Sequence, residues 1–209
     1  MEKALHIRKQ QREGIGAVRT AAGMRVRQHS RLQRGYLVKQ GVDCAKIVEV
    51  TPPVNPDKNP GGPIPRQLCS FLESAGLVLF TAVARLDVFR DVDLLLQAGV
   101  RLMDSGVPVK LLIVGGGEFD DISRKELGGR VSVRYAESFM ITERVAKSEL
   151  YSLFLSLRRQ AIFACTSRYE TLGITPLEAA LSGVVTVIPD SPFVEAARLP
   201  RETALQSNG

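Results

Sequence analysis

The stretch Leu77-Val-Leu-Phe-Thr-Ala-Val-Ala84 decides the fold, together with the amphipathic segment that follows it. The first is an apolar run of strand length, which is typical of a strand buried on both faces of a sheet. Asp91–Met103 then repeats apolar residues at helical spacing, so that one face carries Val92, Leu95, Leu96, Gly99, Leu102 and Met103. A strand followed directly by a helix is the building block of α/β proteins.

The same alternation of strands and helices continues towards the C-terminus. We predict further strands at Val109–Val114, Val131–Tyr135, Ala161–Cys165 and Val184–Ile188. We predict the intervening and final helices at Glu118–Leu127, Lys147–Arg158, Thr175–Ser182 and Phe193–Leu199. Such alternation indicates right-handed crossovers and a doubly wound parallel sheet, whose ligands bind at the carboxyl ends of the strands.

Residues 1–46 differ from the rest of the chain in charge. They hold 11 Lys/Arg against 3 Asp/Glu, a net charge of +8, whereas the remainder carries −2. Their Arg-, Gln- and Ala-rich composition predicts one or two helices within residues 2–40, interrupted near Gly14, Gly16 and Gly23. A proline-rich loop, Thr51–Arg66, lies shortly after them. We therefore expect a basic helical segment over residues 1–46 and an α/β domain over residues 47–209.

The composition excludes several classes of protein. The chain has 209 residues, 44% of them hydrophobic, but no apolar run of about 18 residues and no apolar stretch behind its charged N-terminus. Its three cysteines are far apart and its two histidines are isolated, so we expect no disulfide framework and no metal site. We expect a cytoplasmic protein.

The basic segment admits more than one interpretation. Its charges can form a solvated helical face, or they can hold the protein peripherally at an anionic membrane surface. Nucleic acid is the least favoured partner, because no aromatic residues interleave the charges to stack on bases.

The most informative motif is Ser167-Arg-Tyr-Glu-Thr-Leu-Gly-Ile-Thr-Pro-Leu-Glu-Ala-Ala180, which lies between an apolar strand and a helix. Free backbone N–H groups before that helix could hold a diphosphate, aided by the helix dipole; the residues concerned are Thr171, Leu172 and Gly173. The carboxylates of Glu170 and Glu178 flank these residues and could accept hydrogen bonds from sugar hydroxyls.

The same residues also have a structural interpretation. Thr175-Pro-Leu-Glu178 reads as a capping box, with Thr175 as the N-cap and Pro176 at the first helical position. Glu170 would then be an ordinary loop carboxylate. The residues themselves leave both interpretations open.

The motif resembles the E-x7-E motif of family 4 and related GT-B glycosyltransferases, with Glu170 and Glu178 as its two acids. Phe80–Asp93 is similar to a second segment of these enzymes, a strand that ends in an arginine and is followed by a lysine. Arg85 matches the arginine, while Arg90 stands where lysine is usual and Asp91 where glycine is usual. The resemblance covers residues 29–198.

The resemblance implies that residues 47–209 form the Rossmann-like C-terminal domain of a GT-B glycosyltransferase, which binds a nucleotide-diphosphate sugar. It implies transfer of the sugar with retention of configuration, with no metal and no cofactor beyond the donor. By this resemblance the catalytic residues are Arg85, Arg90 and Glu170. The donor-binding residues are Glu178, Thr171, Leu172 and Gly173.

The sequence also departs from this family. The N-terminal acceptor domain has no counterpart in residues 1–46, which we interpret as a remnant of that domain or a linker from it, and the long helix expected after Phe193 is absent. We therefore expect an incomplete donor-binding domain: a fragment, or a subunit whose partner chain carries the acceptor half. A degenerate, non-catalytic nucleotide-sugar-binding or regulatory module is the alternative.

Overall fold

The computed structural model describes residues 16–20, 23–50, 54, 61–73, 76–117 and 120–197. The chain divides into two compact units. The first unit comprises residues 1–54, 169–173 and 190–209, and the second unit comprises residues 55–168 and 174–189. Two later segments of the chain thus belong to the first unit. The predicted division into a basic segment, residues 1–46, and an α/β domain, residues 47–209, stays a prediction. The origin of residues 1–46 as a remnant of an acceptor domain stays a prediction.

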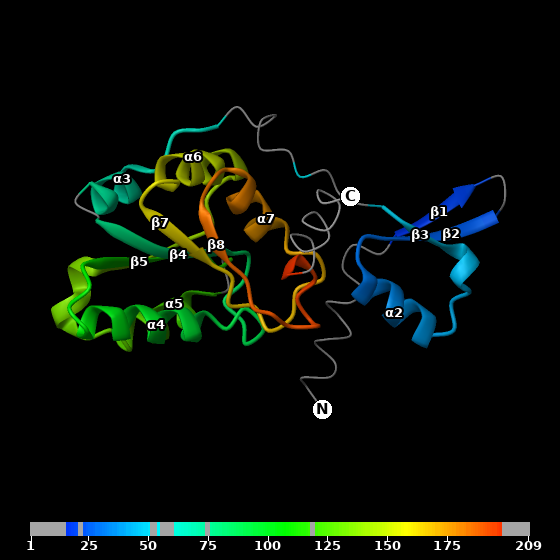
Figure 1. The fold of residues 1–209 in the computed structure, drawn as a ribbon, viewed down its shortest axis with the longest axis horizontal. Helices are drawn as coiled ribbons and strands as arrows, with labels where there is room; N and C mark the ends of the chain where they lie inside the picture. Colours follow the sequence, from blue (N-terminus) through cyan, green and yellow to red (C-terminus); the bar gives the residue numbers. More distant parts are fainter. Residues whose placement is uncertain are drawn as a thin grey trace, which may run out of the picture. The chain divides into compact units, whose positions relative to one another are not determined.

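The second unit is built on a five-stranded sheet in the order β6-β5-β4-β7-β8 (Figure 1). All its neighbouring strands pair in parallel, and the strands are β4 Leu77–Val83, β5 Val109–Gly115, β6 Phe139–Thr142, β7 Ala161–Ala164 and β8 Val185–Val187. The chain starts at the central strand, moves outward on one side, and returns to the centre to move outward on the other. This order confirms the predicted doubly wound parallel sheet.

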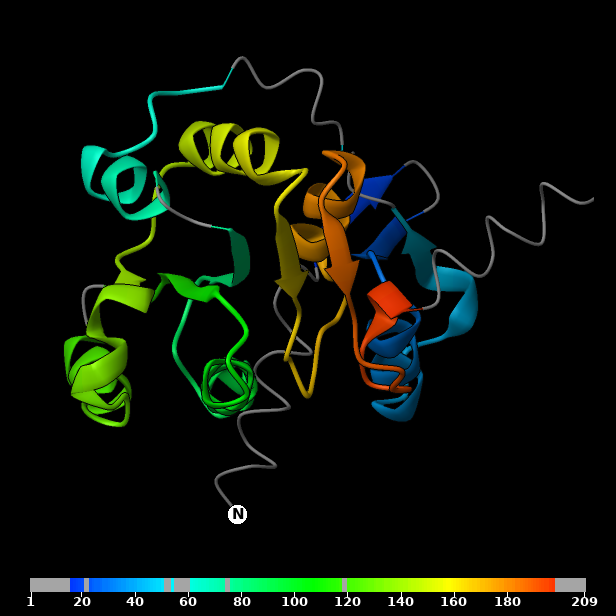
Figure 2. The same ribbon diagram turned by 60° about the vertical axis from the view of Figure 1, so that its left-hand side comes forward.

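Helices cover both faces of this sheet, as both ribbon views show (Figures 1 and 2). On one face lie α3 Arg66–Leu72, α6 Lys147–Leu157 and α7 Ile174–Leu181. On the other face lie α4 Val92–Asp104 and α5 Asp121–Gly129. The helices predicted at the places of α4, α5, α6 and α7 are confirmed, with ends that shift by up to three residues because terminal turns depend on local capping. Helix α3 was not predicted.

Strand β4 separates two hydrophobic cores. Val78, Phe80 and Ala82 face the core beneath α3 and α6, whereas Leu79 faces the core beneath α4. Neighbouring residues of a strand point to opposite faces, so an unbroken apolar run can fill both cores. The Phe80 ring packs edge to face on Phe163 at 5.2 Å between centroids.

Helix α4 approaches β5 closely because Gly99 lacks a side chain. A Cβ atom at Gly99 would lie 2.8 Å from Cδ2 of Leu111. The glycine in the predicted apolar face of α4 is therefore a packing residue, which lets the helix backbone rest on the strand.

The first unit contains a small sheet in the order β1-β2-β3. Strands β1 Gly16–Thr20 and β2 Gly23–Gln28 are antiparallel, and β3 Ile47–Glu49 runs parallel to β2. The prediction of helix across residues 2–40 is therefore wrong for residues 16–20 and 23–28, and residues 1–15 lie outside the described part. The β-branched residues Val18, Thr20 and Val26 and the glycines at the start of each strand disfavour a helix here.

Within the described residues of this basic region one α-helix is present, α2 Arg31–Lys39. It begins at Ser30, whose side chain accepts a hydrogen bond from the Gln33 backbone N–H at 3.2 Å. Polar side chains are buried beside it: Gln28 donates to Glu49 at 3.4 Å and accepts from the Ser30 N–H at 2.6 Å. This packing depends on hydrogen bonds that helical periodicity does not reveal.

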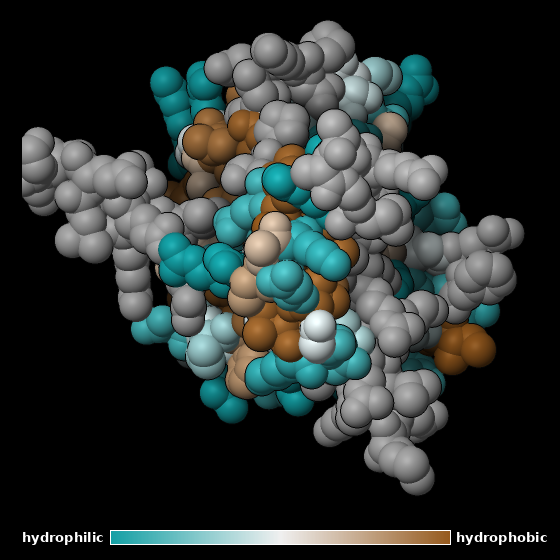
Figure 3. Space-filling model, turned by 90° about the vertical axis from the view of Figure 1, so that its right-hand side faces the viewer, coloured by the Kyte–Doolittle hydropathy of each residue, from teal (hydrophilic) through white to brown (hydrophobic). Residues whose placement is uncertain are grey.

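Several basic side chains of the first unit lie on its surface. Arg25, Arg27, Arg34 and Lys39 are all exposed. A space-filling view of this side of the molecule shows hydrophilic residues bordering a hydrophobic area (Figure 3). No helix in the described ranges is long and apolar enough to cross a membrane.

The strand predicted at Val131–Tyr135 is wrong. Residues Val133–Ser138 form a 3-10 helix, and the strand β6 is Phe139–Thr142, paired with β5. Val131–Tyr135 alternates apolar and polar residues, but Val133 is 89% exposed and contributes nothing to the core. The neighbouring run Phe139–Thr142 fits the half-buried edge of the sheet better because three of its four residues are apolar.

The helix predicted at Phe193–Leu199 is also wrong in the described part. Only Glu195–Ala197 is helical, as a single 3-10 turn, and residues 198 and 199 lie outside the described part. The Phe193 N–H bonds instead to the side chain of Ser191, at 3.2 Å. Of the proline-rich loop predicted at Thr51–Arg66, residues 51–53 and 55–60 are likewise outside the described part.

Gly115 at the end of β5 permits the close approach of β4. Its φ is +145°, and a Cβ atom there would lie 1.9 Å from the carbonyl oxygen of Val83. We predict that Gly115→Ala lowers the free energy of unfolding by about 2 kcal/mol or more, because the clash is with backbone that cannot move aside. Gly128→Ala is the control: it meets nothing within 4 Å in α5, so helix propensity should leave stability unchanged or raised by up to about 1 kcal/mol. Urea denaturation of both variants measures this, and equal midpoints would contradict it.

Candidate functional site

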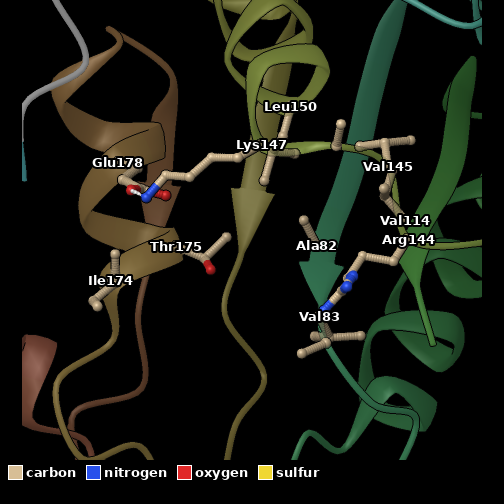
Figure 4. Close-up of a pocket in the computed structure, with 12 residues that line it drawn as sticks. Ala82, Val83, Val114, Arg144, Val145, Lys147, Leu150, Ile174, Thr175 and Glu178 are labelled. Carbon is tan, nitrogen blue, oxygen red and sulfur yellow. Dashed lines mark ion pairs between the residues drawn. The ribbon is translucent and has the colours of Figure 1, made fainter. Parts of the chain in front are cut away.

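A pocket of about 360 Å³ opens in the second unit at the carboxyl ends of β4 and β5 (Figure 4). The strand ends contribute small apolar residues, and the loop after β6 and the first turns of α6 and α7 contribute the polar ones. The lining residues are Ala82, Val83, Ala84, Val114, Arg144, Val145, Ala146, Lys147, Leu150, Ile174, Thr175 and Glu178. The pocket lies where β5 departs from one side of β4 and β7 from the other, which is the place where doubly wound folds bind ligands.

Glu178 is the buried acid of this pocket. It lies on α7 with its side chain only 5% exposed, and its Oε1 is 2.7 Å from Nζ of Lys147, the first residue of α6 (Figure 4). The Tyr151 hydroxyl, one turn further along α6, also bonds to the Glu178 side chain. A carboxylate so deeply buried needs such partners, because removing a charge from water is costly.

Tyr151 is the donor in its bond with Glu178. Burial raises the pKa of the Tyr151 hydroxyl, and the hydrogen bond to Glu178 and the negative charge of that side chain raise the pKa further. The hydroxyl therefore keeps its proton throughout the neutral range and donates it to the carboxylate.

The capping box predicted at Thr175-Pro-Leu-Glu178 is not formed. Helix α7 begins at Ile174, so Thr175 and Pro176 lie inside its first turn, and Glu178 bonds to α6 instead of reaching back. Pro176 is tolerated there because the first N–H groups of a helix have no partner within the helix. The burial of Glu178 thus requires an explanation other than helix capping.

The other predicted residues of the motif belong to the first unit. Glu170 is held by its backbone: its N–H donates to the Phe193 carbonyl at 2.8 Å, and its carbonyl accepts from the Glu195 N–H at 3.0 Å. Thr171 is partly buried and Leu172 is buried. Gly173 has φ +76°, the left-handed conformation that favours glycine, immediately before α7. The motif is therefore divided between the two units: residues 170–173 belong to the first unit and Glu178 belongs to the second.

The two predicted arginines lie in the turn after β4. Nε of Arg85 is 3.4 Å from Oδ2 of Asp87, and Nη1 of Arg90 donates to Oγ of Ser167 at 3.3 Å. Asp87 also organises the turn, because its Oδ1 accepts from the backbone N–H of Phe89 at 3.0 Å. Both arginines thus follow the end of β4, which lines the pocket. Their binding of a diphosphate stays a prediction.

Asp91 adopts the backbone conformation of a glycine. Its φ and ψ are 44° and 45°, and no other non-glycine residue in the described ranges has a positive φ. This is the position where the resemblance places a glycine. The Asp91 side chain pairs with Nε of Arg168 at 2.6 Å, and aspartate tolerates the left-handed region better than most residues.

Sequence analysis missed two basic residues of the pocket, Arg144 and Lys147. The sequence prediction placed the strand at Val131–Tyr135, so the loop expected at its carboxyl end began at residue 136. The strand is instead β6, Phe139–Thr142, and the loop that follows it and lines the pocket is residues 143–146. The Arg144 side chain extends towards Val83 at the end of β4 (Figure 4). Within the described part of the chain Arg144 has no ion-pair partner. The apolar run Phe139–Ile141 is the sequence signal that could have placed Arg144 at the end of a strand.

The described residues also hold no group of three or more His, Cys, Asp or Glu side chains arranged as metal ligands.

Comparison with known proteins identifies the family. The model of the glycosyl transferases group 1 matches residues 71–202, which include the whole pocket. The chain belongs to this family. No curated protein matches the chain.

Solved structures of glycosyl transferases show the same fold. Anabaena HepE, solved in complex with UDP and glucose, has a TM-score of 0.59 at 15% identity, covering 87% of this chain and 54% of that one. A trehalose-phosphate synthase from Burkholderia vietnamiensis has a TM-score of 0.56 at 18% identity, covering 86% and 44%. TarM has a TM-score of 0.57 at 17% identity, covering 80% and 30%. The chain therefore spans about half or less of the length of these structures, and its sheet matches the Rossmann-like domain of a GT-B fold.

The left-handed conformation at Asp91 leads to a test. We predict that Asp91→Gly is more stable than Asp91→Ala by about 1 kcal/mol, because both lose the pairing with Arg168 but only alanine has a Cβ that clashes in this conformation. Chemical denaturation of the two variants side by side measures the difference. An alanine variant as stable as the glycine variant would show that the turn relaxes out of the left-handed region.

Proposed function

We propose that the chain supplies the donor-binding half of a retaining glycosyltransferase, which transfers a sugar from a nucleotide-diphosphate sugar to an acceptor. The observation that carries the proposal is the buried carboxylate of Glu178 in a pocket at the switch point of the sheet. Membership of the glycosyl transferases group 1 supports it, as does the fold shared with HepE, which was solved with UDP and glucose.

The pocket suits the nucleoside end of such a donor. Apolar residues of β4, β5 and α6 line it and can contact the faces of a base; they include Val83, Val114 and Leu150. Glu178 supplies an acceptor for ribose hydroxyls at the same wall. Arg144 adds a positive charge at the strand end, where it would favour an anionic ligand.

The reaction needs stabilisation of a leaving group more than covalent help from the protein. When the bond between the sugar and the diphosphate breaks, negative charge grows on the diphosphate. We assign its stabilisation to Arg85 and Arg90 and to the backbone N–H groups of Thr171, Leu172 and Gly173, because preorganised donors are most effective where charge develops. Glu170 would orient the donor sugar and Glu178 the ribose. The scheme uses no metal and no further cofactor.

Two proposals on partners accompany this function. A chain carrying an acceptor-binding half would complete the enzyme. The exposed basic residues of the first unit, such as Arg25, Arg27 and Arg34, would support peripheral contact with an anionic membrane. A non-catalytic nucleotide-sugar-binding module remains the alternative to an enzyme.

Calorimetric titration with UDP, GDP, ADP and the corresponding sugar nucleotides tests the donor site. We expect binding to nucleotides of one base, weakened about tenfold or more by Glu178→Ala and by Arg85→Ala, because each removes a charged hydrogen-bonding partner worth about 1.5–3 kcal/mol. Glu126→Ala and Arg101→Ala, which change exposed residues outside the pocket, are the matched controls and should bind as the parent chain does.

Each other outcome has a definite meaning. A folded chain that binds none of these nucleotides contradicts the proposal. Binding without transfer to any acceptor, even when the missing half is supplied, favours the non-catalytic module.

A further inference from the structure

Lys147 and Tyr151 hold Glu178 from one face of one helix. They are four residues apart on α6, so their side chains are neighbours on the helix surface. Lys147 contributes the 2.7 Å ion pair and Tyr151 the hydrogen bond. The Lys147 ammonium also lies 5.8 Å from the centre of the Tyr151 ring, within cation–π range. We call Lys147 and Tyr151 the α6 clamp.

The α6 clamp leaves part of the carboxylate available. An ionised carboxylate can accept about four hydrogen bonds, and the clamp accounts for two. Glu178 itself lines the pocket, so a ligand there can use the remaining capacity. Two neighbouring hydroxyl groups on one sugar ring would match this capacity.

We propose that Lys147 and Tyr151 are positioning residues that hold the Glu178 carboxylate for the vicinal hydroxyls of the donor's ribose. The inference rests on the proposed function, because it assigns a nucleotide to this pocket. Glutamate has three rotatable side-chain bonds, and two donors on one rigid helix restrict them before the ligand arrives. Preorganisation of this kind increases affinity by reducing what must be ordered on binding.

The two clamp residues act in different ways. Lys147 is 62% exposed and places a positive charge beside the side chain of Glu178, which is 5% exposed. Tyr151 is buried, and its hydroxyl fixes the direction of the carboxylate through a hydrogen bond. Ribose recognition should therefore be sensitive to both residues, although neither needs to touch the base or the diphosphate.

A purely structural role makes a different prediction. If the clamp only tied α6 to α7, its loss would weaken every ligand of the pocket to the same extent. If it positions Glu178, its loss should reduce the advantage of ribose over 2′-deoxyribose in particular. The ratio of the two affinities separates the roles, because general loosening of the pocket cancels from it.

The test uses the full chain and matched pairs of ligands: UDP with dUDP, GDP with dGDP, and ADP with dADP, titrated calorimetrically. We expect the parent chain to bind the preferred ribonucleotide about tenfold or more tightly than its 2′-deoxy form, as the loss of a hydrogen bond to a charged group implies. We expect Lys147→Met and Tyr151→Phe to reduce this ratio to about 3 or less, by the same reasoning.

Two controls accompany the variants. Lys147→Arg keeps the charge and should restore most of the ratio. Lys125→Met removes an exposed lysine of α5 that does not line the pocket, and it should leave the ratio unchanged. Circular dichroism and thermal melting confirm that each variant is folded.

The remaining outcomes overturn the inference in distinguishable ways. Variants that bind both sugars more weakly with an unchanged ratio make the clamp purely structural. Tighter ribonucleotide binding by Lys147→Met would mean that Lys147 competes with the ribose for Glu178. A parent chain that binds nucleotides without distinguishing ribose from deoxyribose removes Glu178 from ribose recognition but keeps the nucleotide site. A parent chain that binds no nucleotide removes the proposed function and this inference together.

Discussion

The burial of β4 on both faces constrains the rest of the second unit. Because its residues fill the cores on both sides, β4 must be flanked by parallel strands and covered by helices above and below. The chain therefore leaves it in both directions, through β5 and through β7, and the carboxyl end of β4 becomes the floor of a cleft between the two departures. The pocket is a consequence of this topology, and its chemistry comes from the loops that surround it.

Charge in that pocket is arranged around one buried carboxylate. Glu178 is bound from α6 by a cation and a hydroxyl, so the two helices that border the pocket are linked through the group that we propose recognises sugar hydroxyls. A structural link and a binding role are compatible, since a ligand-binding carboxylate has to be held still. Asp91 likewise combines two roles: its backbone adopts the left-handed conformation usual for glycine, and its side chain pairs with Arg168.

Much of the second unit could be predicted from the sequence alone. Apolar runs of strand length and helical periodicity are local properties, so β4, β5, β7, β8 and helices α4, α6 and α7 were located closely, and the parallel order followed from their alternation. The motif residues from Glu170 to Glu178 were likewise visible, because their spacing in the sequence is itself the signal. The same local rule failed at Val131–Tyr135, where apolar and polar residues alternate but Val133 is exposed, because the rule uses residue type alone and takes no account of burial.

The sequence by itself therefore determined the class of fold, the central strand and the acid that the pocket contains. Only the tertiary structure decided which side chains surround that acid. Lys147 and Tyr151 are 31 and 27 residues before Glu178, and their contact with it depends on α6 and α7 packing on the same face of the sheet. The antiparallel pairing of residues 16–20 with residues 23–28 was decided in the same way, because strand pairing depends on hydrogen bonds between two backbone segments, which composition and helical periodicity do not reveal.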